Sequence, residues 1–320
     1  MPDRVLVTGA TGFVGSHIAE IFVEAGYEVR CGLRARSNPR WISDLPVERV
    51  PLDLTRPEDL PQAVKNTDVV VHAAGTVKAR RTSDYHPVNA EGTRRLAAAA
   101  AGAGVRRFVL ISSLAARGPD ALAKDGQDHP VSAYGQSKLK AEEYLRAFGE
   151  QMETVALRPA GVYGPRDTEL LLLFKMANGG WLILPSGPNV LQPTYATDVA
   201  RAALAAARKF VGFGPFLLAE AARYTWRDVV DKLEKVLDRP VRVVRLPASV
   251  FKLAGSAAEW VAKLRNTVPV FDERQASDLA VHTWTCDSFG TERALGWRAE
   301  VTLFEGLERT ARWYRQAGWI

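Results

Sequence analysis

Short apolar runs alternate with stretches of helical periodicity through the first half of the chain. The runs lie at residues 5–7, 28–33, 47–52, 68–74, 107–112 and 154–158, and helical patterns lie between them at 57–65, 88–103 and 132–148. The runs are nearly continuous in hydrophobicity, as expected when helices cover both faces of a sheet. The alternation predicts an α/β fold with a doubly wound parallel sheet, which binds ligands at the carboxyl ends of its strands.

Beyond about residue 160 the pattern becomes irregular, with loops rich in proline and glycine. Further helical patterns and one apolar run follow at 197–209, 226–237, 248–264 and 241–246. We interpret this part as a smaller, mostly C-terminal α/β lobe for the substrate, interleaved with the sheet domain. The expected sheet domain comprises residues 1–160 and about 191–212, and the expected lobe about 161–190 and 213–320.

The turn after the first apolar run contains three glycines, Gly9, Gly12 and Gly15. Gly9 permits the sharp turn from strand to helix, Gly12 lets a pyrophosphate approach the backbone, and Gly15 lets helix and strand pack closely. The free N–H groups and positive dipole end of the helix would face the anion. The turn opens a strand–helix–strand unit of about 30 residues, which is the context that this motif requires. It predicts a dinucleotide cofactor that contacts Gly9, Thr11, Gly12, Phe13, Val14 and Gly15.

A tyrosine and a lysine four residues apart, Tyr134 and Lys138, lie in the helical pattern at 132–148. Residues at this spacing share one helix face, and Ser113 follows the preceding strand at the carboxyl edge of the expected sheet. An ammonium about 4 Å from the phenol would favour the phenolate by up to roughly 4 kcal/mol, or about 3 pKa units, at an effective dielectric of about 20. We therefore predict that Ser113, Tyr134 and Lys138 are catalytic. Tyr134 would be the general acid–base, Ser113 would hold the substrate oxygen and Lys138 would also bond the nicotinamide ribose.

Charge and composition exclude several classes of protein. The net charge of +6 comes from scattered basic residues, so we expect a small-molecule substrate and no nucleic acid. Two cysteines, Cys31 and Cys286, cannot build a disulfide framework, and neither belongs to a metal-ligand cluster. The N-terminus lacks a signal-peptide pattern and no run approaches about 18 apolar residues, which predicts a cytoplasmic protein without a membrane span or a metal.

Several further motifs, taken with the glycine turn, resemble the extended short-chain dehydrogenase/reductase family of NAD(P)-dependent epimerases, dehydratases and reductases. They are Asp53-Leu54, His72-Ala73-Ala74-Gly75, Asn89-x-x-Gly92-Thr93, Ser112-Ser113, Tyr134-x-x-x-Lys138, Arg158-Pro159 and a closing segment between Leu295 and Tyr314. The resemblance covers essentially the whole chain and implies a Rossmann-like fold.

The resemblance also implies roles for single positions. Asp53 and Leu54 would hold the adenine. Ala73, Ala74 and Gly75 would pass under the cofactor, and Pro159, Ala160 and Val162 would border the nicotinamide. Asn89 and Gly92 would pack helices and hold turns rather than act in catalysis. Many members dimerise through a four-helix interface, which implies a homodimer formed here by the helices at 88–103 and 132–148.

The end of the second apolar run bears on the choice of cofactor. An enzyme that prefers NAD places an acid there to bond the ribose 2′-hydroxyl. Residues 30–38 contain no acid and include Arg34 and Arg36. Because arginine grips a 2′-phosphate with paired charge-assisted bonds, we predict a preference for NADP(H) over NAD(H), with Arg34 as the main contact and Arg36 as a second one.

The motifs near the catalytic residues favour a largely apolar substrate. Ser113 is followed by Leu114-Ala115, without the acid pair of the family's sugar dehydratases, and this segment is similar to the steroid-dehydrogenase and dihydroflavonol-reductase branch. Apolar residues at helical spacing within 250–264 fit either a substrate lid or the packing of the lobe. We expect reversible hydride transfer between a ketone and a secondary alcohol. The alternatives are a nucleotide-sugar epimerase and a non-catalytic, NADP-binding redox sensor.

Overall fold

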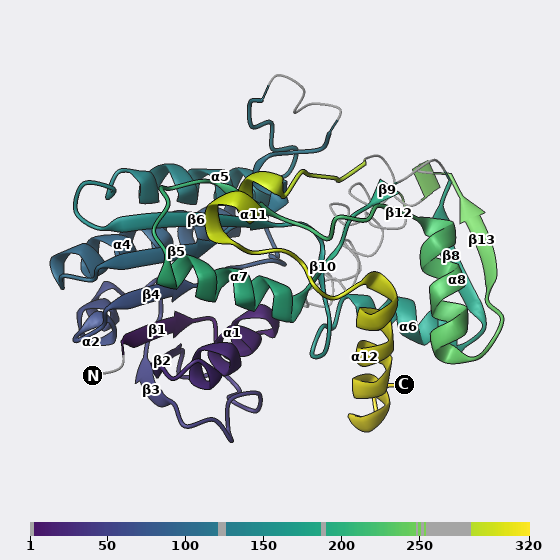
Figure 1. Cartoon of the computed structure of the whole chain (residues 1–320), viewed down its shortest axis with the longest axis horizontal. Helices are drawn as coiled ribbons and strands as arrows, with labels where there is room; N and C mark the ends of the chain where they lie inside the picture. The colour runs from purple at the N-terminus through teal and green to yellow at the C-terminus, as the bar shows by residue number, and fades with distance from the viewer. Residues whose placement is uncertain (1–2, 121–125, 187–189, 248, 251–252, 254–282) are drawn as a thin grey trace.

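A seven-stranded parallel sheet forms the centre of the molecule (Figure 1). The computed structural model describes residues 3–120, 126–186, 190–247, 249–250, 253 and 283–320. The strands of the sheet are β1 (Arg4–Thr8), β2 (Glu28–Leu33), β3 (Glu48–Pro51), β4 (Val69–His72), β5 (Arg107–Ile111), β6 (Glu153–Pro159) and β11 (Phe216–Leu218). Their order is β11-β6-β5-β4-β1-β2-β3, so the doubly wound parallel sheet is confirmed.

Helices cover both faces of the sheet. Successive residues of each strand point to opposite sides, and because these residues are apolar, both faces need a covering layer. Val5 and Val7 of β1 pack with α1 (Phe13–Glu24) and α7 (Ala196–Arg208) in one core. Leu6, between them, packs in a second core on the other face. The helices of that face are α2 (Leu60–Val64), α4 (Glu91–Gly102) and α5 (Ala133–Arg146). The apolar runs of the sequence are therefore strands buried on both sides.

A second group of elements packs beside the sheet, on the right in Figure 1. The strands β8 (Trp181–Pro185) and β13 (Arg242–Leu246) form a parallel pair, and Leu182 and Leu184 of β8 enter the core of this group. Its helices are α6 (Leu170–Asn178), α8 (Trp226–Leu237) and α12 (Leu303–Gln316). Phe174 and Tyr314 are fully buried among them. This lobe is thus an α/β unit with a core of its own.

The remaining elements are short. They are η1 (Pro57–Asp59), η2 (Thr82–Asp84), α3 (Tyr85–Asn89), η3 (Leu114–Ala116), β7 (Val162–Tyr163), β9 (Val190–Leu191), β10 (Thr194–Tyr195), β12 (Tyr224–Thr225) and α11 (Phe289–Leu295).

Several of the predicted boundaries differ from the structure. The helix expected over 88–103 is divided into α3 and α4 at Ala90. The strand β11 pairs with β6 in the sheet, so the sheet extends past the break expected at about residue 213. The helix expected at 248–264 lies largely outside the described residues.

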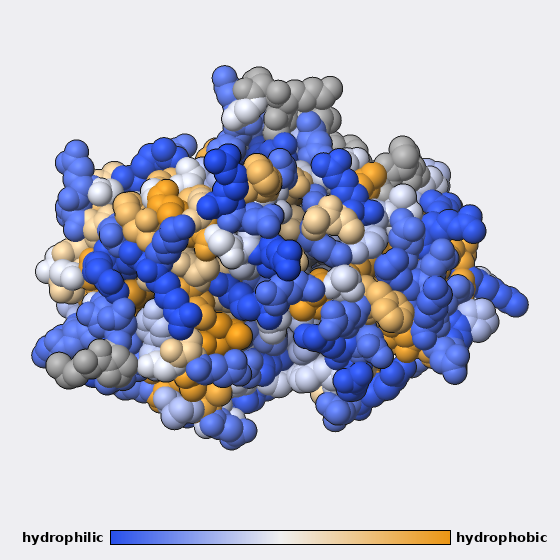
Figure 2. All heavy atoms as spheres, in the orientation of Figure 1, coloured by the Kyte–Doolittle hydropathy of each residue, from blue (hydrophilic) through white to orange (hydrophobic). Residues whose placement is uncertain are grey.

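Polar and charged residues cover most of the face seen in Figure 2, with hydrophobic atoms exposed between them. In the described ranges, none of the helices combines the length and the apolar character needed to cross a membrane.

Candidate active site

The strand order of the sheet reverses beside β1, which has β2 on one side and β4 on the other. Loops that leave neighbouring strands in opposite directions open a crevice at such a point, at the carboxyl ends of the strands. The loop after β1 and the loop after β4 touch there. A Cβ atom added to Gly9 would lie 2.7 Å from the backbone nitrogen of Ala74. The predicted glycine turn and the Ala73–Gly75 segment therefore form one surface.

The glycine turn fits the pyrophosphate of a dinucleotide. Gly9 has a φ of +73°, a conformation that favours glycine, and a Cβ on Gly15 would overlap the carbonyl oxygen of Gly9. Gly12 is the N-cap of α1; it makes no side-chain cap bond, and the first turn of α1 contains no acid. The N–H groups at this end of the helix, together with its dipole, suit a bound anion.

A buried histidine fixes the segment after β4. Thr93 Oγ1 donates to the carbonyl of Asn89 at 2.6 Å, so it accepts a hydrogen bond from His72 Nε2 at 3.0 Å. His72 Nδ1 then accepts from Thr8 Oγ1 at 2.7 Å, and Thr8 Oγ1 accepts from the N–H of Ala74 at 3.1 Å. Burial, and secondly the positive charge of Lys138, lowers the pKa of His72 to about 3. The imidazole is thus neutral, with its proton on Nε2, and it aligns Ala74.

The helix α5 and the turn η3 bring Tyr134, Lys138 and Ser113 to the same end of the sheet. Ser132 caps α5 by accepting from the N–H of Gly135 at 3.1 Å. A Cβ on Gly135 would overlap the carbonyl oxygen of Ala115, so α5 and η3 touch through backbone. Tyr134 and Lys138 lie on α5. Ser113 follows the end of β5 and is the N-cap of η3.

The two ionisable side chains on this face of α5 have different surroundings. Lys138 is 5% exposed, and its Nζ donates to the carbonyl oxygen of Ile111 at 2.7 Å. Burial lowers the pKa of Lys138 to about 8, against the opposing effect of Glu142. The ring of Tyr134 is half-buried and meets the ring of Tyr85 edge-on, with centroids 6.0 Å apart. Ser113 Oγ accepts a hydrogen bond from the N–H of Ala115 at 3.1 Å.

The side chain of Asn89 joins α5 to the segment after β4. It accepts from the N–H of Thr76 at 2.7 Å and donates to the carbonyl of Thr76 at 3.0 Å and to Ser137 Oγ at 2.9 Å. A Cβ on Gly75 would lie 3.0 Å from Asn89 Oδ1 and 4.0 Å from Lys138 Nζ. Gly75 and Lys138 are therefore close neighbours, as a shared contact with one cofactor requires.

Sequence reasoning missed a buried ion network behind Ser113. Arg158 Nη2 donates to Glu142 at 2.6 Å and to Asp128 at 2.7 Å, and Ser112 donates a short hydrogen bond to Glu142. Glu142 and Arg158 are each 3% exposed. Glu142 comes four residues after Lys138 on α5, so its spacing was a usable signal. Its ion pair with Arg158 could not be predicted, because the two residues lie on different elements and share no local sequence pattern.

The residues predicted for the adenosine end lie at the carboxyl ends of β2 and β3. Asp53 accepts from the N–H and the hydroxyl of Thr55 at 2.9 and 2.7 Å. Partial burial raises the pKa of Asp53, but these bonds and the positive charge of Arg34 outweigh it and lower that pKa. Arg34 and Arg36 are exposed, whereas Leu54 is buried against Gly92. The positive charge of Arg34 therefore acts on the carboxylate of Asp53.

The residues predicted to border the nicotinamide lie at the end of β6. Pro159 is the last residue of that strand, Val162 packs at the edge of the α1-side core, and Ala160 is 6% exposed. Ala160 belongs to a small apolar cluster with Leu114, which directly follows Ser113. The other members are Ala219, Cys286, Leu217 and Trp284. A buried apolar cluster therefore begins at the residue after Ser113.

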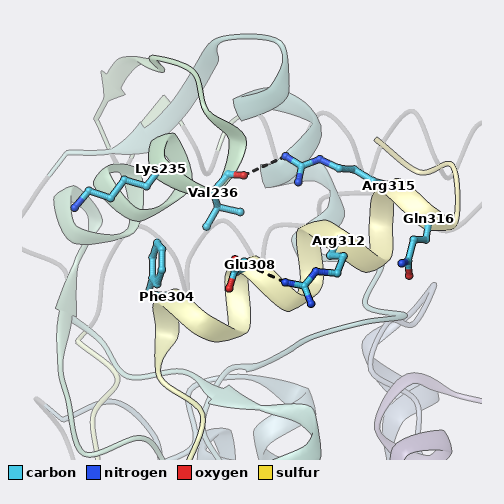
Figure 3. Close-up of a pocket in the computed structure, with 7 residues that line it drawn as sticks. All are labelled: Lys235, Val236, Phe304, Glu308, Arg312, Arg315 and Gln316. Carbon is cyan, nitrogen blue, oxygen red and sulfur yellow. Dashed lines mark hydrogen bonds and ion pairs between the residues drawn. The ribbon is translucent and has the colours of Figure 1, made fainter.

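A separate pocket of about 270 Å³ lies between α8 and α12 (Figure 3). Arg315 of α12 donates to the carbonyl of Val236 of α8 at 3.1 Å, and Arg312 pairs with Glu308 on the same helix at 3.7 Å. Its lining residues are Lys235, Val236, Phe304, Glu308, Arg312, Arg315 and Gln316, none of which belongs to the constellation around Tyr134. The predicted acid–base groups and the glycine turn lie instead at the carboxyl edge of the sheet.

Comparisons with known proteins agree with this geometry. The sequence model of the NAD dependent epimerase/dehydratase family matches residues 5–215. Ceramide reductase of Caulobacter vibrioides is 35% identical, over 99% of this chain and 96% of that protein. UDP-glucose 4-epimerase of Vibrio cholerae is 29% identical, over 99% of this chain and 97% of that protein.

The crystal structure of UDP-glucose 4-epimerase from Thermotoga maritima has the same fold, with a TM-score of 0.80 at 22% identity over 98% of this chain and 99% of that one. The matches extend over the glycine turn, the sheet and the second lobe. This chain is a member of the NAD-dependent epimerase/dehydratase family, the extended short-chain dehydrogenases/reductases, and is an NAD(P)-dependent oxidoreductase or epimerase.

Proposed function

We propose that this protein catalyses reversible reduction of a ketone to a secondary alcohol on a largely apolar small molecule, with NADP(H) as the preferred cofactor. The observation that supports it most is the position of Ser113. The serine lies on the same sheet edge as the Tyr134–Lys138 pair, and Leu114 beside it belongs to an apolar cluster. The similarity to ceramide reductase supports an apolar substrate as well.

The cofactor would be held by the glycine turn, the Ala73–Gly75 segment and Lys138, and when bound it supplies or accepts the hydride. Tyr134 donates a proton to the ketone oxygen during reduction and takes it back during oxidation. Ser113 donates a hydrogen bond to the same oxygen and stabilises the charge that develops on it. Lys138, protonated below about pH 8, stabilises the phenolate that Tyr134 leaves behind.

The preference for NADP(H) is supported by Arg34, which is exposed at the end of β2 and close to Asp53. In Arg34→Asp we expect the ratio of the dissociation constants for NADPH and NADH to reverse, because an acid repels a 2′-phosphate and bonds a 2′-hydroxyl. Arg36→Ala should weaken NADPH binding less. A wild-type protein that binds NADH more tightly would overturn this part of the proposal.

A panel of apolar ketones and alcohols, followed by NADPH absorbance, tests the reaction itself. Nucleotide sugars are analysed in parallel for their products. Turnover of ketones with NADPH supports the proposal. Conversion of a nucleotide sugar with tightly retained cofactor and no net NADPH turnover would favour the epimerase instead. NADPH binding without either reaction would favour a redox-sensing module.

We also propose a homodimer in which α4 and α5 of each protomer form the interface. The outer faces of these helices present Arg94, Ala98, Gln136 and Glu143, which are exposed in one chain. Light scattering should give twice the mass of one chain, and Ala98→Glu together with Gln136→Glu should halve it. A monomeric wild-type protein would contradict this assembly.

A further inference from the structure

The strand pair β8–β13 has an unusually apolar exposed surface. Twelve large hydrophobic residues of the described chain have exposed side chains, and four of them lie in these two strands. They are Trp181, Ile183, Val243 and Val244. Figure 2 shows hydrophobic atoms at the right-hand margin of the surface, where Figure 1 places β8 and β13. Single exposed hydrophobic residues are normal, but a gathering of them marks an interaction site.

The register of the strands places three of these residues, Trp181, Ile183 and Val244, on one face. In β8, Leu182 and Leu184 are buried, whereas Trp181 and Ile183 are 51% and 45% exposed. The partners of the exposed pair on β13 are Arg242 and Val244, respectively. Neighbouring residues in register point to the same side of a sheet. Trp181, Ile183, Arg242 and Val244 therefore form the outer face of the pair, which we call the β8–β13 face.

The charge on this face is positive. The guanidinium of Arg242 lies 5.3 Å from the centroid of the Trp181 ring. Neither strand contains an acid, and the chain as a whole has a net charge of +6. Electrostatic complementarity therefore selects an anionic partner that also accepts apolar side chains.

We propose that the β8–β13 face docks on the surface of a bilayer that contains anionic phospholipids. Tryptophan places its apolar ring at the acyl boundary and its N–H among the headgroups. The aliphatic residues enter the same boundary, and arginines attract the lipid phosphates. Docking of this kind needs no membrane-spanning helix. It goes beyond the proposed reaction, and it would bring the lobe of the enzyme to the phase in which apolar molecules are dissolved.

Co-sedimentation with vesicles tests this proposal without substrate or cofactor. We expect the wild-type protein to bind vesicles of phosphatidylcholine with one-third phosphatidylglycerol, and to bind less in high salt or with phosphatidylcholine alone. The double variant Trp181→Ala, Ile183→Ser should lower the partition coefficient at least about tenfold. Arg242→Glu should lower it roughly fivefold or more. The control Phe289→Ala, which removes a 59% exposed ring on α11, should leave it unchanged.

The outcomes separate the rival occupants of this face. No binding of the wild-type protein to the anionic vesicles, or equal binding by the double variant, would overturn the proposal. A fall in the solution mass of the double variant would assign the face to a second copy of the chain. A lower melting temperature without vesicle binding would assign it to another part of the same chain. Reduction of a water-soluble ketone should be the same in all three variants, so failure of the reaction and failure of docking can be told apart.

Discussion

Lys138 Nζ, on the helix α5, donates a 2.7 Å hydrogen bond to the carbonyl oxygen of Ile111, the last residue of β5. This bond ties the helix that bears Tyr134 to the strand that leads into Ser113. The lysine is 5% exposed, so its charge is held in a place that water hardly reaches. A buried ammonium at this position is unfavourable for folding and useful for stabilising a phenolate.

The stability of the fold should depend on pH through Lys138. The pKa of Lys138 is about 8 in the folded protein and 10.5 ordinarily. Between pH 8 and pH 10.5 the amine is therefore protonated in the unfolded chain but largely neutral in the folded protein, so the free energy of unfolding rises with pH. The free energy of unfolding of the wild type, relative to Lys138→Met, should rise by up to roughly 3 kcal/mol from pH 8 to pH 10.5. Urea unfolding at several pH values measures this difference. The matched variant Lys140→Met, on the exposed side of α5, should give a flat difference; a flat difference for Lys138→Met would show that the lysine is not desolvated.

Glu142 should set the pH range of the reaction through the same lysine. Its negative charge raises the pKa of Lys138 against the lowering by burial, so Glu142→Gln should lower that pKa further. The decline of kcat/KM for ketone reduction, expected above about pH 8 in the wild type, should begin at lower pH in this variant. The control Glu150→Gln, which alters an exposed acid beyond the end of α5, should keep the wild-type profile. If the two profiles coincide, Glu142 has only a structural role.

His72 should make the protein less stable in acid. The pKa of His72 is about 3 in the folded protein and 6.5 ordinarily. As the pH falls below 6.5, the unfolded chain therefore binds a proton at this residue that the folded protein does not bind, and this favours unfolding. The wild type should therefore lose roughly 2 kcal/mol relative to His72→Asn between pH 6.5 and pH 5. Thermal unfolding at matched pH values measures this loss. His86→Asn, at an exposed position, serves as the control for the loss of a histidine.

The loop after β2 should depend on the C-terminal end of the chain for its position. The ring of Trp41 lies 6.4 Å from that of Trp319, the guanidinium of Arg40 lies 4.0 Å from the Trp41 centroid, and Arg166 lies 5.5 Å from it. Arg166 in turn donates to Ser16 Oγ of α1 at 2.9 Å. We expect Trp319→Ala to raise the Kd for NADPH about fivefold, the effect of roughly 1 kcal/mol of lost loop ordering.

Isothermal titration calorimetry measures that Kd, and Phe304→Ala, on the helix α12 that precedes Trp319, is the control. An unchanged Kd for Trp319→Ala would mean that the loop bearing Arg34 is held by its own residues alone.

The sequence predicted the elements whose pattern is local. The bounds of β2 and α8 agree with the predicted ranges 28–33 and 226–237, because continuous apolar runs and amphipathic helices are signals within one segment. The strand β11 was missed, since its three residues are too few to form a pattern. The two-residue strands β7 and β10 were missed for the same reason.

The candidate site divides in the same way. The glycine turn and the Tyr134–Lys138 pair are local motifs, and the structure brings both to the carboxyl edge of the sheet. The bonds from Arg158 to Asp128 and Glu142 join segments that meet only after folding. No local pattern in these segments predicts that they pair. The neutral state of His72 likewise follows from its complete burial, which could not be predicted from the neighbouring residues in the sequence.

The most direct test of the proposed reaction is a comparison of Tyr134→Phe with the wild-type protein under single-turnover conditions, with NADPH and an apolar ketone that the wild type reduces. Loss of the phenol removes the proton donor but leaves the glycine turn, Lys138 and the apolar cluster in place. We predict that the rate of ketone reduction falls by about 10² to 10⁴-fold while the Kd for NADPH stays within about twofold. Reduction at the wild-type rate by Tyr134→Phe would contradict the assignment of Tyr134 as the proton donor.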